Sequence, residues 1–89
     1  MVNLLLKKYL NNNLKTLAKI HKLSKEKGYA YYSEIEDYLN RGRNQVSTIL
    51  SKLETDDLIR REKENRPQRI FITSRGRNLI QAIANELTF

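Results

Sequence analysis

The sequence predicts a small α+β domain that is mostly helical. Three observations lead to this prediction: four segments carry apolar residues at helical spacing, one later stretch has a strand-like period, and the chain has 89 residues, enough for one small domain. No internal repeat and no break in composition interrupts the chain. Residues 1–89 are therefore predicted to form a single domain.

The first predicted helix covers residues 3–27, in one piece or in two pieces around the asparagines at 11–13. One of its faces repeats at spacings of three and four: Leu6, Leu10, Leu14, Leu17, His21 and Ser24. Lys27 followed by Gly28 is a typical helix end, because a cation suits the negative end of the helix dipole. The tyrosine-rich residues 29–32 then predict one short strand.

Two further helices follow in quick succession. Ser33 and Glu36 have the spacing of a capping box, which predicts a short helix over about 34–40. This helix is expected to bury Ile35, Tyr38 and Leu39. After a tight turn, a third helix is predicted over about 43–56. Its core stripe repeats at i, i+3, i+4 and i+7: Val46, Ile49, Leu50 and Leu53.

The period becomes strand-like after Ile59. Residues 60–64 and 68–73 are predicted to form the arms of a hairpin, with the turn at 65–67. Arginines lie on both arms and in the turn, which a core role does not explain. Ser74 is then expected to cap a last helix over about 75–87. The apolar stripe of this helix consists of Leu79, Ile80, Ile83 and Leu87, widened by Ala82 and Ala84.

Helix, short strand, helix, turn, helix, basic hairpin and helix is the order of a winged helix-turn-helix. In that fold the third helix projects far enough to enter the major groove of DNA, and the hairpin reaches flanking phosphates or the minor groove. The side of the third helix opposite its core stripe is polar and carries a single charge: Asn44, Gln45, Ser47, Thr48, Ser51 and Lys52. Side chains of this kind read base edges, whereas a merely solvated helix face more often carries Glu and Lys pairs.

The charge of the chain points to the same partner. The net charge is +7, from 17 basic and 10 acidic residues, which favours a polyanion such as nucleic acid, although solubility alone stays open. All eight arginines lie between residues 41 and 77, whereas the basic residues of segment 1–27 are all lysines. Because the planar arginine fork suits phosphates and guanine edges, 41–77 is the main predicted contact surface, and 1–27 is a second, weaker candidate.

Several classes of protein are not expected from the composition. The chain has no cysteine, which excludes thiolate metal sites and disulfide scaffolds. With one histidine, His21, a multi-histidine metal site or a histidine-dependent catalytic triad is not expected. Glu34, Glu36 and Asp37 fit the first turn of a helix better than a catalytic carboxylate pair. No stretch approaches the roughly 18 apolar residues of a membrane span, and the start does not resemble a secretory signal. We expect a cytoplasmic protein without catalytic residue, metal or cofactor, and with His21 packed in the fold rather than acting as a pH switch.

Residues 33–80 resemble MarR-type and related winged-helix transcription regulators, most closely the small versions found in archaea and their viruses and plasmids. The resemblance rests on QVSTILSKL, on the following LI and basic residue, and on ITSRGR before an apolar helix; it covers about 14–85. A viral member of this group would work in the host cytoplasm. The family usually has glycine where this chain has Asp57, a position expected to adopt the left-handed region.

The resemblance implies roles for individual residues. The third helix becomes the recognition helix, with base-reading roles for Asn44, Gln45, Ser47, Thr48 and Ser51. Phosphate contacts are implied for Arg41, Arg43 and Lys52. The wing is implied to contribute Arg60, Arg61, Lys63, Arg66 and Arg69, with Arg66 at its tip. Arg75 and Arg77 either touch phosphate or solubilise the start of the last helix.

The two ends of the chain carry more apolar surface than one small core can cover. In MarR-like proteins the terminal helices form the dimer interface, here residues 1–13 and 75–89. The implied interface residues are Leu5, Leu6, Tyr9, Leu10, Leu79, Ile80, Ile83 and Leu87. Two recognition helices about 34 Å apart would read a palindrome. The alternative is that residues 1–10 form a frayed tail.

The sequence therefore predicts a sequence-specific, homodimeric transcription regulator that binds double-stranded DNA, without a small-molecule effector. Two alternatives stay open: an architectural or replication-associated DNA-binding protein, and a winged helix used for protein–protein assembly. The five tyrosines are predicted to pack in and around the core, with a stacking platform for single strands as the alternative.

Overall fold

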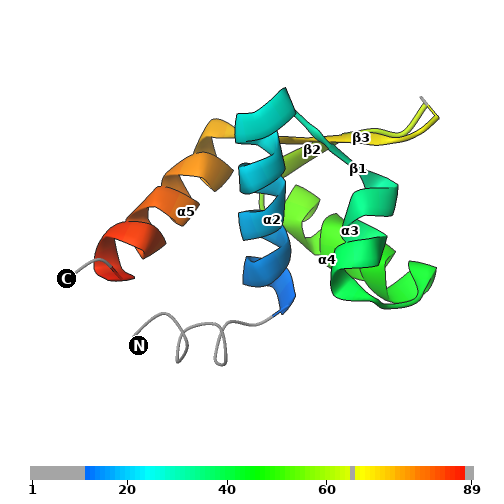
Figure 1. Cartoon of the computed structure of the whole chain (residues 1–89), viewed down its shortest axis with the longest axis horizontal. Coiled ribbons are helices and arrows are strands. Elements are labelled where there is room, and N and C mark those ends of the chain that lie inside the picture. Colours follow the sequence, from blue (N-terminus) through cyan, green and yellow to red (C-terminus); the bar gives the residue numbers. More distant parts are fainter. Residues whose placement is uncertain (1–11, 65, 88–89) are drawn as a thin grey trace.

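The computed structural model of the chain describes residues 12–64 and 66–87, with side chains described up to residue 84. Its elements follow the predicted order, as Figure 1 shows: α2 (Asn12–Lys27), β1 (Ala30–Tyr31), α3 (Tyr32–Leu39), α4 (Arg43–Thr55), β2 (Ile59–Glu62), β3 (Arg69–Ile72) and α5 (Ser74–Leu87). The predicted helix over 3–27 is confirmed for residues 12–27. Four predicted interface residues, Leu5, Leu6, Tyr9 and Leu10, lie outside the described residues.

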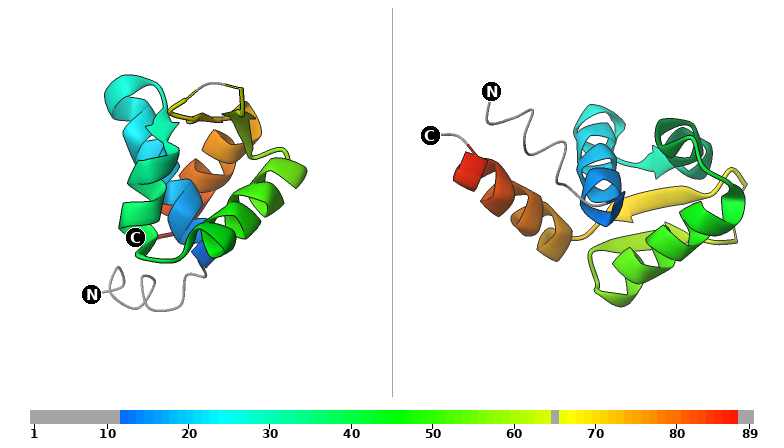
Figure 2. Two further views of the ribbon diagram at one scale, coloured as in Figure 1. Left: turned by 90° about the vertical axis from the view of Figure 1, so that its right-hand side faces the viewer. Right: turned by 90° about the horizontal axis from the view of Figure 1, so that it is seen from below.

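The strands form one antiparallel sheet in the order β1-β3-β2. β2 and β3 build the predicted hairpin, with Ile59 opposite Ile72 and Arg61 opposite Ile70. β1 adds two residues at the other edge of β3. The tip of the hairpin extends beyond the helices in Figure 1, at the same end of the molecule as the turn between α3 and α4. The views in Figure 2 agree with this placement.

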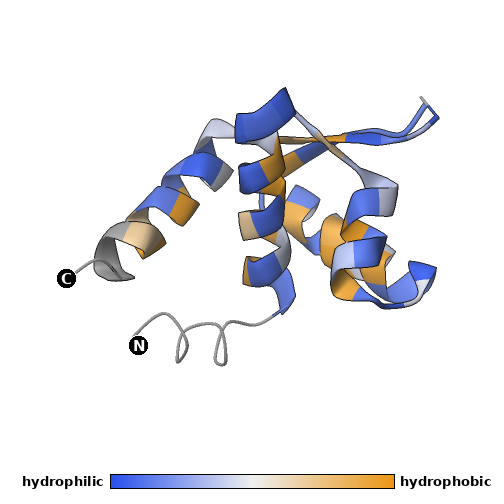
Figure 3. Ribbon diagram, viewed as in Figure 1, coloured by the Kyte–Doolittle hydropathy of each residue, from blue (hydrophilic) through white to orange (hydrophobic). Residues whose placement is uncertain are grey.

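Helix α2 crosses the middle of the molecule and contacts α3, α4, α5 and the strands. Two of its side chains, Leu17 and Ile20, are completely buried. The predicted stripe of α4 is confirmed, because all four of its apolar residues are buried: Val46, Ile49, Leu50 and Leu53. Figure 3 shows hydrophobic residues gathered where α2 faces α4 and the strands, and a hydrophilic hairpin tip. One core therefore holds α4 and the hairpin on a common body.

The start of α3 differs from the prediction. The helix begins at Tyr32, and the backbone N–H of Tyr31 donates to Oε1 of Glu34 at 2.8 Å, so Glu34 rather than Glu36 serves the helix start. The expected burial of Tyr38 is wrong, because this side chain is 46% exposed. Its ring lies 5.3 Å from the ammonium of Lys19. The buried face of α3 is therefore narrower than predicted and centres on Ile35.

The start of α5 is held by Thr73 and not by Ser74 as predicted. The Thr73 hydroxyl accepts the N–H of Gly76 at 3.0 Å and lies 2.7 Å from the carbonyl oxygen of Asp57, to which it donates. A side-chain carbon on Gly76 would lie 2.2 Å from the carbonyl oxygen of Leu58. Glycine therefore lets the first turn of α5 approach the segment that enters β2.

Two predictions about single residues are confirmed. Asp57 has a φ of 61° and thus adopts the left-handed conformation expected for the position after the recognition helix. His21 is packed in the fold, with 7% of its surface exposed. Burial lowers the pKa of His21, and the positive charges of Lys25 and Arg77 lower it further. Burial and the two nearby cations therefore favour the neutral imidazole.

Candidate nucleic-acid interface

The exposed side of α4 carries the predicted base-reading side chains in different environments. Asn44, Gln45 and Thr48 are exposed. Gln45 accepts a long hydrogen bond of 3.4 Å from Arg41, and the Thr48 hydroxyl donates to the backbone carbonyl of Asn44 at 2.8 Å. These contacts leave the amide groups and the threonine oxygen open to an external partner. Arg43 and Lys52 are also exposed on this helix.

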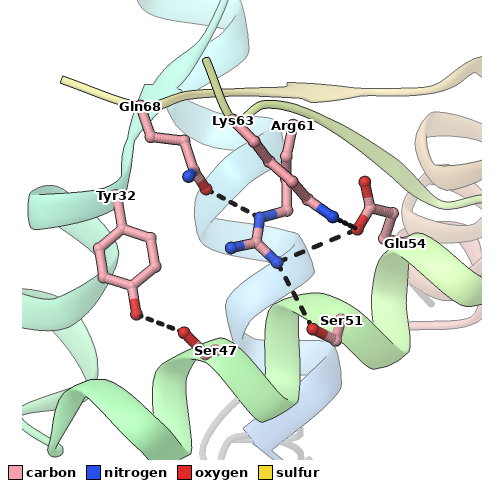
Figure 4. Close-up of polar contacts among 7 residues, drawn as sticks. All are labelled: Tyr32, Ser47, Ser51, Glu54, Arg61, Lys63 and Gln68. Carbon is pink, nitrogen blue, oxygen red and sulfur yellow. Dashed lines mark hydrogen bonds and ion pairs between the residues drawn. The ribbon is translucent and has the colours of Figure 1, made fainter. Parts of the chain in front are cut away.

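The two serines of α4 contact neighbouring elements of the chain. The oxygens of Ser47 and Tyr32 lie 2.9 Å apart, and the Tyr32 hydroxyl donates to the carbonyl of Arg43 at 3.0 Å. These contacts join α3 to α4. Ser51 lies 3.5 Å from a terminal nitrogen of Arg61 on the hairpin, as Figure 4 shows. Ser47 and Ser51 thus connect α4 to its neighbours, whereas the sequence suggested base contacts alone.

The arginines of β2 point to opposite faces of the hairpin. Arg61 lies opposite the buried Ile70, so its side chain points inward with Ile59, and only 8% of it is exposed. Its Nε donates to Gln68 at 2.8 Å, and a terminal nitrogen lies 4.0 Å from Glu54 (Figure 4). Arg61 therefore joins both arms of the hairpin to α4. The structure gives this residue a positioning role that the charge pattern does not reveal.

Two other predicted wing residues lie on the α4 side of the hairpin or in its turn. The ammonium of Lys63 is 3.1 Å from Glu54, yet 59% of this side chain is exposed. Arg66 is exposed beside Pro67 in the turn. Both cations are accessible to a partner that lies against α4. They extend the basic surface from the recognition helix to the hairpin turn.

The outer face of the sheet holds a different cluster, formed by Lys27, Tyr29, Tyr31, Arg69 and Phe71. Tyr29 stacks on Phe71 with 6.2 Å between ring centroids and meets Tyr31 edge-on at 5.1 Å. The guanidinium of Arg69 covers Tyr29 and Phe71 and donates to Glu62 at 2.7 Å. A hydrogen bond with Glu34 raises the pKa of Lys27. The two cations of this cluster therefore already have acidic partners, Glu62 for Arg69 and Glu34 for Lys27.

Arg60 and Arg69 belong to this outer face, whereas Arg61 belongs to the inner face. Sequence reasoning grouped all three as wing contacts. The available signal was the two-residue period of a strand, which separates Arg60 from Arg61. Two of the five predicted wing cations therefore point away from α4.

Neither a metal-ligand group nor a membrane-spanning helix is present among the described residues. No group of three or more histidine, aspartate or glutamate side chains among the described residues could hold a metal ion. Within the same residues, no helix is both long and apolar enough to cross a membrane.

On the α5 side, Leu79 is 37% exposed. Ile80 packs against the edge of the core, and Ile83 is half-buried. The side chain of Leu87 lies outside the described residues. In Figure 1, α5 extends away from the rest of the molecule. Three of the predicted interface residues thus lie on a helix that the described residues cover only in part.

A family model described as the DUF6293 C-terminal winged helix domain matches residues 4–84, and no curated protein matches the chain. Among solved structures, AF1382 from Archaeoglobus fulgidus is similar, with a TM-score of 0.80 and 24% identity over 92% of this chain and 91% of that chain. The MepR–DNA complex of S. aureus has a TM-score of 0.70 and 24% identity over 94% of this chain and 62% of that chain.

A MarR-family transcriptional regulator from Silicibacter pomeroyi has a TM-score of 0.65 and 21% identity over 85% of this chain and 50% of that chain. The chain thus spans about three fifths of MepR and half of the Silicibacter protein. At these identities the likeness establishes the fold. The fold is the mostly helical winged helix that the sequence predicted, with MarR-like architecture.

Proposed function

Because this chain belongs to the DUF6293 C-terminal winged helix domain family, we propose that it binds double-stranded DNA and regulates transcription. One observation carries the proposal: α4 exposes uncharged hydrogen-bonding side chains beside exposed cations on the same helix and on the nearby hairpin turn. The first kind of side chain reads base edges, and the second holds phosphates. On the same grounds we place the protein in the cytoplasm, with the DNA.

Helix α4 enters the major groove in this proposal. Asn44 and Gln45 have the amide groups that pair with adenine, and Thr48 suits several bases. Arg41, Arg43 and Lys52 flank these residues and hold phosphates. Ser47 is half-buried and Ser51 is exposed, and both assist through their hydroxyls.

The hairpin supports the same duplex with Lys63 and Arg66, which are exposed near α4 and in the turn. Arg60 and Arg69 lie on the outer face, so we assign them only a long-range attraction for the duplex. Two solved relatives support DNA as the partner: MepR was solved in complex with DNA, and the Silicibacter protein is described as a transcriptional regulator.

The protein acts as a homodimer in this proposal. Leu79, Ile80 and Ile83 on α5 are the apolar residues that a second copy would cover. A two-fold axis through this contact gives two α4 helices, whose separation on DNA is about 34 Å for successive major grooves. The preferred site is then a palindrome.

Selection of bound sites from random duplexes tests the function. The expected result is one enriched motif with two symmetric halves. Binding without an enriched motif would instead favour an architectural protein that reads shape and charge. No binding to any duplex at low salt would contradict the proposal and leave a winged helix used for protein–protein assembly.

A further inference from the structure

A groove of about 320 Å³ lies between α3, α4 and the hairpin. Tyr32 of α3, Ser47 of α4 and two hairpin residues, Arg61 and Gln68, contribute to its lining. Three of the proposed phosphate contacts, Arg43 of α4 and Lys63 and Arg66 of the hairpin, also line it. Whatever occupies this groove therefore touches the recognition helix and the wing at the same time.

Arg61 is the buried charge of this groove, with 8% of its side chain exposed. Its Nε donates to Gln68, and one terminal nitrogen is shared between Ser51 and Glu54. The other terminal nitrogen has no hydrogen-bond partner among the described residues, and in Figure 4 it points toward the side of Tyr32 and Ser47. This nitrogen is accessible from the groove, so it can donate to an acceptor from outside the chain.

Two hydroxyls line the same groove. The Tyr32 hydroxyl donates to the carbonyl of Arg43 at 3.0 Å, and the Ser47 oxygen lies 2.9 Å from the Tyr32 oxygen. Because the single Tyr32 hydrogen goes to the Arg43 carbonyl, the hydrogen between the two oxygens comes from Ser47. The Ser47 hydroxyl therefore donates to a ligand in the groove only when it leaves the Tyr32 oxygen.

The charges around the groove select an anion. Besides Arg61, the lining includes Arg43, Lys63 and Arg66, against one lining carboxylate, Glu36, and the neighbouring Glu54, which pairs with Arg61 and Lys63. Four cations with a planar guanidinium among them match the oxygens of a phosphate.

We infer that this groove holds a phosphate, and specifically one phosphodiester of the DNA backbone for each recognition helix. The inference rests on the proposed function. Arg61 then has two tasks: its bonds to Gln68, Ser51 and Glu54 fix the hairpin against α4, and its remaining nitrogen donates to the phosphate. The phosphate therefore sets how deeply α4 sits between the strands of the duplex.

A scan with single methylphosphonates tests the inference, because each substitution removes the charge of one backbone phosphate. Affinity is measured for the wild type, Arg61→Met, Ser47→Ala and Arg60→Met on every modified duplex and on the unmodified one. For the wild type, one phosphate per recognition helix is expected to show a loss of roughly tenfold, typical of a hydrogen bond to a charged group. At that position Arg61→Met and Ser47→Ala lose much less, because their contact is already gone.

Arg60→Met is the matched control, because its arginine is adjacent in sequence but on the outer face. Arg60→Met is expected to lose affinity at the neutralised phosphate by the same factor as the wild type, whatever its affinity for the unmodified duplex. Ser47→Ala removes a single oxygen and keeps the test valid if Arg61→Met does not fold. The inference is overturned if Arg61→Met and Ser47→Ala, where folded, lose the same factor as the wild type at every phosphate.

Failure of the proposed function has a separate signature, which is the absence of wild-type binding to unmodified duplexes. In that case inorganic phosphate is titrated at constant ionic strength while the Nε–H signal of Arg61 is followed by NMR. A saturable shift of this signal would show that the groove binds phosphate but would overturn the assignment of that phosphate to DNA. An unchanged signal would overturn phosphate binding in the groove as well.

Discussion

Helices α4 and α5 carry similar apolar stripes, but the chain covers them to different degrees. In α4, Val46 and Leu50 are completely buried and Leu53 is 2% exposed. In α5, Leu79 is 37% exposed and Ile80 packs only against the edge of the core. Helix α4 lies among the other elements in Figure 2, whereas α5 extends away from them.

The difference between α4 and α5 shows that an apolar stripe in the sequence does not by itself determine how far the stripe is buried. The period identifies the apolar face of a helix, but the neighbours decide whether one chain can bury that face. The apolar stripe of α4 is buried by other elements of the chain, so the opposite face of this helix is available for a polar partner. In our proposal the stripe of α5 is completed by a second copy. Four predictions test this difference between α4 and α5 and the surfaces beside them.

The largest effect is expected for Ile83→Glu on α5. A carboxylate in an apolar contact between two copies costs several kcal/mol, so the variant should be monomeric. Its affinity for the palindrome should fall by orders of magnitude, because the second half-site no longer benefits from a high effective concentration. Sedimentation and a DNA titration on the same variant check this. A wild type that sediments as a monomer at micromolar concentration and binds one half-site would refute the dimer.

A pair of leucines compares the two stripes directly. Leu50→Ala should lower the free energy of unfolding by about 2–5 kcal/mol, because it empties a completely buried site. In the monomer, Leu79→Ala should cost about 1 kcal/mol or less, since its side chain there keeps contact with water. Urea unfolding of both variants in the monomeric Ile83→Glu background, at one fixed protein concentration, measures both costs. Equal costs would show that α5 is buried as completely as α4.

Arg66→Ala tests the surface beside α4 with a smaller effect. Loss of one phosphate contact should weaken binding to all sequences similarly and reduce the slope of log K against log salt by about one. A salt titration on two unrelated duplexes provides the measurement. An unchanged slope would argue against a phosphate contact at this residue.

The smallest effect is expected at His21, where α2 meets α5. Because the pKa of His21 is lowered in the folded protein, the unfolded chain binds the proton more readily. Its contribution to stability is present above the ordinary histidine pKa of about 6.5 and is lost as the pH falls through the lowered value. Urea unfolding between pH 7 and pH 5 should show this decline, and His21→Gln should remove part of it. A pH dependence identical in both proteins would exclude His21 as the source.

The order of elements was predictable because it depends on local signals. Apolar periods, Gly28 and the basic hairpin each appear in a short window of sequence. The misplaced caps show the limit of such signals. Thr73 and Ser74 are equivalent candidates in sequence, and Thr73 caps α5 while it donates to the distant carbonyl of Asp57. A contact of that kind is invisible until the chain is folded.

The candidate site was predictable on α4 and less so on the hairpin. The stripe of α4 fixes which face is exposed, so Asn44, Gln45 and Thr48 could be selected from their spacing. On the hairpin, alternation separates Arg60 from Arg61, but which of them points inward depends on the pairing with β3. The partners of Arg61 come from two other segments, and no local pattern connects them.

The most direct test of the account is the affinity of Gln45→Ala for the selected palindrome and for a scrambled duplex of the same composition. Gln45 is exposed and uncharged, so its contribution to binding should come from a base edge. We predict a loss of about 1–3 kcal/mol on the palindrome and little change on the scrambled duplex. An equal loss on both duplexes would contradict sequence reading by α4.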